Sequence, residues 1–306
     1  MKNTDELIIA LSHEGNTTSV SRLNTNTGGT IAETLEDDRL GSLAVGTDQV
    51  VLANPLDTGT NLFRHLNLAL EPLPAFGTSQ VTGLSVSATG VAAILSGNPG
   101  GGGILFYESD GSQLWSHYNL QKESAWDLTQ RDNIVYIAGA NDTQDGDQGF
   151  IRRLNAATGD TLEPIWTIDI EEKSQLRGLA LDDTNRIHIA GISYTEEETR
   201  MILGCFSPVG DIVFLDSLDS DFKDVYPREI HVDGETVIVA YRKYQPDTEV
   251  AKAGIRASTD QGEEIWNYVV DGGPNVASAL GPEGSFYFAY ELDLKSSRFC
   301  RYEVGQ

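Results

Sequence analysis

The sequence has few positive charges. Its 306 residues include 21 lysines and arginines against 46 aspartates and glutamates, which gives a formal net charge of −25. Proteins that neutralise nucleic-acid phosphates or adhere to anionic membranes use clusters of cations, so this balance argues against nucleic acid as a partner. Acid-rich, lysine-poor surfaces suit high salt, where screening relieves self-repulsion, and the composition therefore suggests a halophilic or marine source.

Long apolar segments and close cysteine pairs are also missing. No run of about 18 apolar residues occurs, so the sequence predicts no membrane insertion. Residues 1–6 are not followed by the apolar stretch of a secretory signal, so we expect a chain made in the cytoplasm that is incorporated into a virion or surface assembly. Cys205 and Cys300 fall in equivalent strands two repeats apart, too far for a bridge, and are predicted to be free thiols.

Helical patterns are absent as well. No stretch of about 12 residues keeps the i, i+3, i+4, i+7 apolar spacing of an amphipathic helix. Short runs of β-branched and aromatic residues, bounded by glycine, aspartate and asparagine, predict strands instead. The most continuously apolar of these runs begins near Leu7, Val50, Val91, Ile134, Ile187, Val237 and Phe286. Such a repeated four-stranded antiparallel unit predicts a β-propeller.

We predict one all-β domain over residues 1–306, a seven-bladed β-propeller. The predicted blades cover residues 5–36, 40–77, 81–120, 124–170, 175–218, 225–271 and 275–304. The chain enters at the second run of a unit and leaves after a third run, so the terminal blades are expected to be incomplete, with three strands each. Six blades that share terminal strands are the alternative.

A turn glycine followed four residues later by an aromatic recurs along the chain. The pairs are Gly111 with Trp115, Gly210 with Phe214, and Gly262 with Trp266. This pattern resembles the PQQ-like family of propeller repeats, and the strands that end in Ala-Gly resemble those of bacterial seven-bladed propellers. The resemblance implies that the tryptophans are wedged between neighbouring blades. It implies quinone chemistry only where cofactor residues are present, and this sequence has no close cysteine pair.

One loop is a candidate metal site. Asp142, Asp145 and Asp147 surround Gly146, and closely spaced carboxylates with a central glycine can wrap Ca²⁺. The loop resembles the start of an EF-hand loop, although Arg152 stands where the bidentate glutamate belongs. A solvated hairpin loop without metal is the alternative, and we expect no other cofactor.

Candidate ligand-binding residues lie near the beginning of the first strand of each blade. Propellers bind ligands mainly on the face that carries the connections between blades, and these residues point toward the axis there. They are Trp126, Arg177, Tyr226, Arg228 and Asn275. A mixture of arginine and aromatic side chains suits sugars or a carboxylate-bearing partner. Packing and salt bridging between blades is the alternative.

No local catalytic motif is present. The five histidines are scattered, and no Gly-x-Ser-x-Gly elbow occurs. We therefore expect a non-enzymatic interaction platform, a structural, adhesive or receptor-binding component of a larger assembly such as a virion tail, fibre or decoration, or a cell-surface layer. Its expected partners are other proteins of that assembly or surface glycans. The alternative is a propeller enzyme of the PQQ-dehydrogenase, lactonase or glycan-cleaving type.

Overall fold

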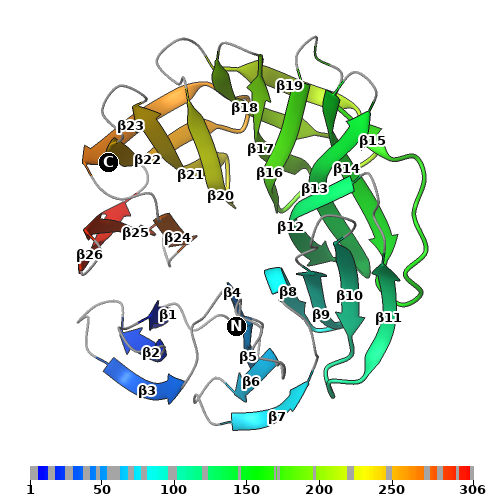
Figure 1. Ribbon diagram of the computed structural model, residues 1–306, viewed down its shortest axis with the longest axis vertical. Coiled ribbons are helices and arrows are strands. Elements are labelled where there is room, and N and C mark those ends of the chain that lie inside the picture. The colour runs from blue at the N-terminus through cyan, green and yellow to red at the C-terminus, as the bar shows by residue number, and fades with distance from the viewer. Residues whose placement is uncertain are drawn as a thin grey trace. The chain divides into compact units, whose positions relative to one another are not determined.

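A computed structural model gives the fold of the chain (Figure 1). It describes residues 6–12, 18–24, 30–36, 42–45, 49–53, 63–67, 72–76, 81–95, 102–118, 123–143, 146–168, 170, 173–195, 198–218, 224–245, 250–271, 276–280, 285–293 and 296–303. Within these ranges every regular element is a β-strand, and no helix could cross a bilayer.

The described strands form seven sheets, and within each sheet hydrogen-bonded neighbours follow one another in sequence. The first contains β1 (Glu6–Ser12), β2 (Thr18–Asn24) and β3 (Thr30–Glu36), and the second contains β4 (Ser42–Val45), β5 (Gln49–Ala53), β6 (Phe63–Asn67) and β7 (Pro72–Phe76). The third contains β8 (Val81–Ser87), β9 (Gly90–Leu95), β10 (Gly103–Tyr107) and β11 (Gln113–Tyr118). The fourth contains β12 (Glu123–Arg131), β13 (Ile134–Thr143), β14 (Gly146–Asn155) and β15 (Trp166–Thr167).

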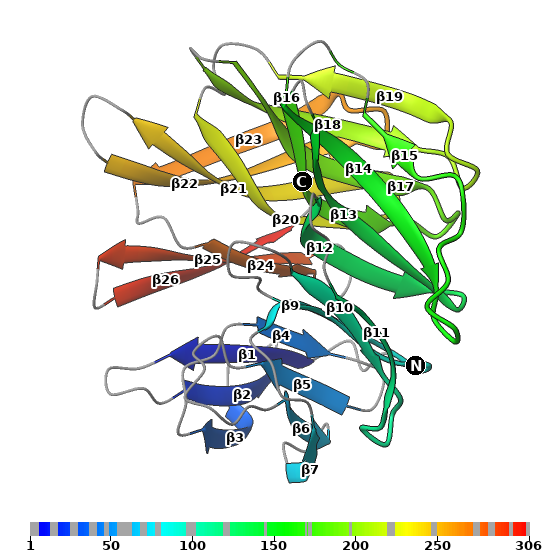
Figure 2. The same cartoon turned by 45° about the vertical axis from the view of Figure 1, so that its right-hand side comes forward.

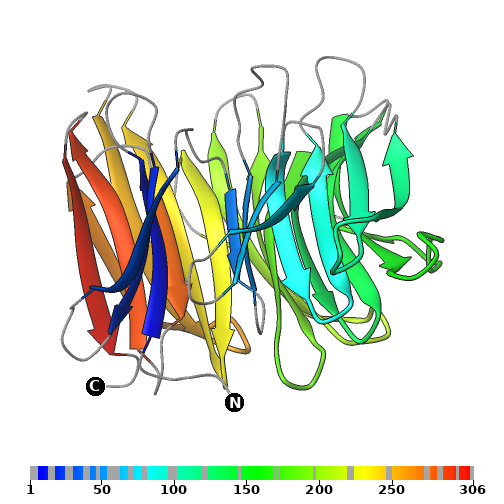
Figure 3. The same ribbon diagram turned by 90° about the horizontal axis from the view of Figure 1, so that it is seen from below.

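The remaining sheets follow the same order. The fifth contains β16 (Lys173–Leu181), β17 (Ile187–Tyr194), β18 (Thr199–Phe206) and β19 (Ile212–Ser217). The sixth contains β20 (Val225–Asp233), β21 (Thr236–Gln245), β22 (Val250–Thr259) and β23 (Glu264–Asp271). The seventh contains β24 (Val276–Leu280), β25 (Ser285–Asp293) and β26 (Ser296–Glu303). In Figure 3 the strands within each sheet lie side by side.

The predicted fold class is confirmed, since the chain is an all-β propeller built of consecutive antiparallel sheets. The first and last described sheets have three strands each, as expected, while the number of blades stays a prediction. The contacts divide the chain into two compact units, Met1–Ile137 with Arg152–Pro164 and Ala138–Ile151 with Ile165–Gln306.

In the four-stranded sheets the described residues of the second strand are mostly buried, because both faces of the strand are covered. All residues of β9 are buried, and in β17 only the last residue is not. Within the second unit, β16 and β20 lie on the inner side in Figure 1, and β19 and β23 lie on the outer side, where most of their residues are exposed.

The recurring glycine and aromatic residues meet across neighbouring sheets. Gly210, with φ +100°, lies against the Trp166 indole so closely that a Cβ atom would come within 2.3 Å of it. Gly159 lies against Trp115 in the same way, and the Trp115 Nε1 donates to the Ala156 carbonyl at 2.7 Å. These aromatics pack between sheets, as the resemblance to PQQ-like repeats implied.

Candidate ligand-binding site

Two of the arginines singled out from the sequence occupy β-bulges. Along β16, Leu176 pairs with Gly191 and Gly178 pairs with Ala190, so Arg177 is an extra residue in the ladder. β20 has the same irregularity at Arg228, between Pro227 and Glu229. A bulge redirects the side chain of its extra residue and is common next to binding sites. The inner strands of two successive sheets therefore each present an arginine outside the regular alternation.

A hydrogen-bonded chain holds Arg177 in place. Its Nη2 donates to Oε1 of Gln175 at 2.5 Å, and the Gln175 Nε2 donates to Oδ2 of Asp147 at 2.6 Å. The hydroxyl of Tyr194 donates to the same Asp147 oxygen at 2.5 Å. Asp147 on β14, Gln175 on β16 and Tyr194 on β17 thus link two neighbouring sheets next to the bulge.

The guanidinium groups of Arg177, Arg228 and Arg242 are close enough for the charges of the last two to act on the first. Burial lowers the pKa of Arg177, and the positive charges of Arg228 and Arg242 lower it further. Arginine nevertheless stays protonated in proteins. The Arg242 Cζ lies 5.1 Å from the centroid of the Tyr226 ring, which is a cation–π distance. We call Arg177, Arg228, Arg242, Tyr194 and Tyr226 the arginine–tyrosine cluster.

Tyr194 keeps its proton well above neutral pH. Burial raises the pKa of Tyr194 to about 12, and the hydrogen bond to Asp147 and the charge of that carboxylate contribute to the increase. The phenol is therefore a hydrogen-bond donor under ordinary conditions. Its single O–H proton is donated to Asp147, so the donors suited to an anionic ligand are the guanidinium groups, each with five N–H bonds.

The sequence-predicted ligand residues divide into three groups. Arg177, Tyr226 and Arg228 are brought together in the second unit. Trp126 belongs to β12 in the first unit, where its side chain is 40% exposed. Asn275 lies outside the described residues. Gln175, Tyr194 and Arg242 also belong to this part of the molecule and were not predicted from the sequence.

A usable signal for the missed residues was the change from apolar to polar at the ends of the second strands. Tyr194 ends β17 and Arg242 follows the buried part of β21. Gly191 gave a second signal, since a Cβ atom there would lie 2.4 Å from the Gln175 carbonyl oxygen. The glycine in the Ala-Gly pair thus leaves room for the backbone beside the Arg177 bulge.

The candidate calcium loop is only partly described. Asp142 is exposed at the end of β13, and Asp145 lies outside the described residues. Asp147 is directed to Gln175 and Tyr194. In the part of the chain that the structure describes, no three histidine, cysteine, aspartate or glutamate side chains converge in a way that could hold a metal ion. Calcium binding by this loop stays a prediction.

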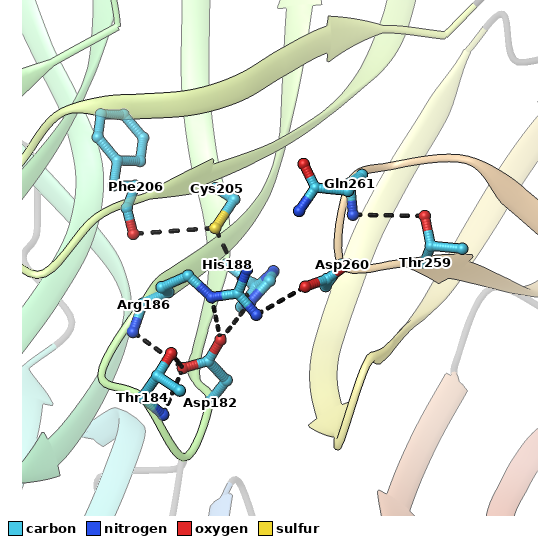
Figure 4. Close-up of polar contacts among 9 residues, drawn as sticks. All are labelled: Asp182, Thr184, Arg186, His188, Cys205, Phe206, Thr259, Asp260 and Gln261. Atoms are coloured by element: carbon cyan, nitrogen blue, oxygen red, sulfur yellow. Dashed lines mark hydrogen bonds and ion pairs between the residues drawn. The ribbon is translucent and has the colours of Figure 1, made fainter.

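A second polar group lies at the other end of the fifth sheet (Figure 4). Asp182 accepts hydrogen bonds from Thr184 and Arg186, and its Oδ2 lies 3.2 Å from Nε2 of His188. The Cys205 Sγ lies 3.9 Å from the same Nε2. A nucleophilic relay needs the thiol and the carboxylate on opposite ring nitrogens. Since Cys205 and His188 are also fully buried, the group supports the fold.

Comparison with known proteins identifies the fold through structure alone. No family model matches the sequence, and no curated protein is similar to it in sequence. The polysaccharide lyase Uly1 is similar over 99% of this chain and 89% of its own, with a TM-score of 0.62 and 9% identity. Hsv2 from Kluyveromyces lactis is similar over 87% of this chain and 85% of its own, with a TM-score of 0.51 and 9% identity. BamB from Moraxella catarrhalis is similar over 94% of this chain and 79% of its own, with a TM-score of 0.48 and 14% identity. The likeness to Uly1 and Hsv2 shows the β-propeller fold.

The expectation that the chain is not an enzyme is contradicted by the comparison with Uly1, a polysaccharide lyase that is similar over nearly all of the chain. The expectation was wrong because it relied on the absence of local motifs. In a propeller, the residues of a site come from different sheets and leave no contiguous signature. The missing Gly-x-Ser-x-Gly elbow therefore excludes no reaction.

Proposed function

We propose that this propeller binds a carboxylate-bearing polysaccharide at the arginine–tyrosine cluster. The observation that carries the proposal is the pair of bulges that present Arg177 and Arg228 from successive inner strands. A guanidinium group pairs with a planar carboxylate through two parallel hydrogen bonds, which a lysine cannot reproduce. Three such groups in a chain with a net charge of −25 favour an anionic ligand.

The tyrosines favour a sugar among anionic ligands. Tyr194 and Tyr226 each combine an apolar ring with a polar hydroxyl, the combination that suits the mixed faces of a pyranose. Both are partly buried, so a ligand would meet them as part of a formed surface. The name of Uly1 as a polysaccharide lyase supports the same class of ligand. Membership in a larger assembly stays a prediction from the sequence.

Cleavage of the bound polysaccharide by elimination is a second candidate. It is favoured by the fold of Uly1 and by the acid–base pair of Tyr194 and Asp147 beside Arg177. Arg177 would neutralise the sugar carboxylate, which makes the adjacent carbon-bound proton more acidic. Asp147 would accept that proton, while the electron pair of the broken C–H bond forms the new carbon–carbon double bond and the bond to the glycosidic oxygen breaks. Tyr194, released from its hydrogen bond to Asp147, would donate its proton to the departing oxygen.

Calorimetric titration of the full chain with oligogalacturonate tests the binding, with a neutral oligosaccharide of equal length as the control ligand. We expect saturable binding of the acidic sugar that weakens with salt. Arg177→Gln should weaken it about tenfold, the loss typical of one charge-assisted contact. Arg131→Gln is the matched control, because Arg131 is the last residue of β12 and does not belong to the arginine–tyrosine cluster. Equal affinity for both ligands, or an unchanged Arg177→Gln variant, would disprove the proposal.

The elimination candidate has an independent readout. Elimination next to a carboxylate creates an unsaturated uronate that absorbs ultraviolet light, so activity appears as rising absorbance. Binding without any absorbance change would reject elimination while leaving the binding site intact. Tyr194→Phe should abolish the absorbance increase and retain most of the affinity.

A further inference from the structure

A separate group of polar side chains lies between the sixth and seventh sheets. Glu229 and His231 are two residues apart on β20, beyond its bulge, so their side chains leave the same face of the strand. Ser278 lies on β24, which packs beside β20 in Figures 1 and 2. All three residues belong to the second unit.

Three polar atoms of this group converge. Oε2 of Glu229 accepts hydrogen bonds from Oγ of Ser278 at 2.6 Å and from its backbone N at 2.5 Å. Nε2 of His231 lies 2.9 Å from the same Oγ and 3.8 Å from the Glu229 oxygen. The three atoms therefore form a small triangle, with sides of 2.6, 2.9 and 3.8 Å.

The arrangement differs from a nucleophilic triad. A triad places the carboxylate on the ring nitrogen that faces away from the serine, where it orients the imidazole. Here Glu229 and His231 both approach the hydroxyl of Ser278, and the carboxylate also accepts the backbone N–H of that residue. The geometry does not support activation of the serine.

The sides of the triangle, from 2.6 to 3.8 Å, bracket the spacing of neighbouring ligands in a zinc coordination sphere, so an ion would bind by replacing the two hydrogen bonds to Oγ of Ser278. Neighbouring ligands of a tetrahedral zinc ion, with bonds of about 2.0–2.1 Å, lie about 3.3 Å apart. The His231 ring is held edge-on against Phe286, with centroids 5.8 Å apart and planes at 63°, which leaves Nε2 directed at Ser278. The His231 and Glu229 side chains are 24% and 38% exposed, so an ion has a route from solvent.

We propose that Glu229, His231 and Ser278 bind a divalent transition-metal ion of the zinc type, with water completing the coordination. Imidazole nitrogen with carboxylate oxygen selects zinc and its neighbours, whereas calcium and magnesium prefer sets made only of oxygen. Ser278 supplies a hydroxyl lone pair and keeps its proton. Glu229 and His231 are ligands of the usual metal-binding types, and Ser278 supplies the third protein ligand.

Titration of the full chain with zinc chloride in a calorimeter tests the site. An excess of calcium chloride in both solutions occupies surface carboxylates that bind divalent ions without selectivity. We expect one zinc ion per chain, with affinity reduced at least about tenfold by His231→Gln and by Glu229→Gln. Glu229→Gln keeps an acceptor for the Ser278 backbone N–H, so the contact between sheets survives.

Two controls keep the outcome interpretable. Cys300→Ser should bind zinc as the wild type does, which excludes the partly exposed thiol as the ligand. Circular dichroism establishes that each variant is folded. Ser278→Ala replaces any variant that does not fold, and it is expected to weaken zinc binding less than His231→Gln does. Absence of saturable zinc binding, or equal affinity in the wild type and both ligand variants, would overturn the proposal.

Discussion

Arg186 connects the turns of two neighbouring sheets by its ion pair with Asp260, whose Oδ2 lies 2.7 Å from the Arg186 Nη2. The Arg186 Nε also donates to Asp182 at 2.6 Å, so one guanidinium joins two carboxylates (Figure 4). Arg186 comes just before β17, and Asp260 lies in the turn between β22 and β23. The contact holds the fifth and sixth sheets together at the end of β17 opposite Tyr194.

A double-mutant cycle of Arg186→Gln and Asp260→Asn should reveal a coupling free energy of about 1 kcal/mol. The two side chains are 24% and 19% exposed, so water weakens the attraction without removing it. Urea unfolding of the four proteins measures the coupling. Additive losses within about 0.3 kcal/mol would show that the two turns are held by other contacts.

Acid should destabilise the protein through Asp182. Burial alone would raise the pKa of this carboxyl, but hydrogen bonds from Thr184, His188 and Arg186 outweigh burial and hold the pKa below its ordinary value of 3.8. The unfolded chain therefore binds the proton more readily. The stabilisation by ionised Asp182 is complete above about pH 4 and is lost as the pH falls toward the folded-state pKa. Asp182→Asn should flatten this part of the stability curve.

His188 should extend the acid sensitivity to milder pH. Burial lowers the pKa of His188 from 6.5, although Asp182 opposes this shift. The folded state thus binds a proton less readily than the unfolded state, and stability falls as the pH drops below about 6.5. Unfolding free energies of the wild type and His188→Gln, measured from about pH 8 down to pH 3, separate the two contributions. A wild-type stability that rises toward acid would contradict both assignments.

Gly210→Ala should be much more destabilising than Gly234→Ala. Both glycines have positive φ, +100° and +57°, so each substitution has a conformational cost of about 1–2 kcal/mol. Only at Gly210 would the new methyl group meet another side chain, the Trp166 indole at 2.3 Å, which adds about 1–3 kcal/mol. Among the described residues, nothing beyond the two chain neighbours lies within 4 Å of a Cβ atom placed at Gly234. Equal losses on urea unfolding would mean that the indole moves aside freely.

The two cysteines should react at very different rates with iodoacetamide. Both are free thiols, as predicted, but Cys205 is fully buried and burial raises its pKa to about 11, so little thiolate is present. Cys300 is partly exposed. Mass spectrometry of the native protein should find Cys300 alkylated first, and Cys205 only after denaturant is added. Simultaneous modification would indicate that the fifth sheet opens readily.

Strand positions could be read from the sequence because burial on both faces leaves a continuous apolar run. The predicted second strands begin near Ile134 and Ile187, where β13 and β17 begin, and near Val237, one residue after the start of β21. Arg177 and Arg228 were chosen for their place near the start of inner strands. Their bulges were not predictable, because a bulge depends on the register with the neighbouring strand.

The contacts between sheets were beyond the reach of sequence reasoning. Asp182 looks like an ordinary turn residue followed by Thr184 and Asn185, and nothing local indicates that Arg186 reaches a turn of the next sheet. Glu229 and Ser278 are likewise far apart in sequence and meet only because β20 and β24 are neighbours. Pairs of this kind would be detectable only as positions that vary together among related sequences.

The bulges also bear on how such a scaffold can acquire new selectivity. A bulged residue stands outside the inward and outward alternation that packs a strand, so its exchange leaves the neighbours on their original faces. β8 has the same irregularity at Thr82, which shows that the backbone feature does not require arginine. Positions 177 and 228 are therefore natural sites for a focused mutational library, in which recognition could be redesigned while the apolar second strands remain untouched.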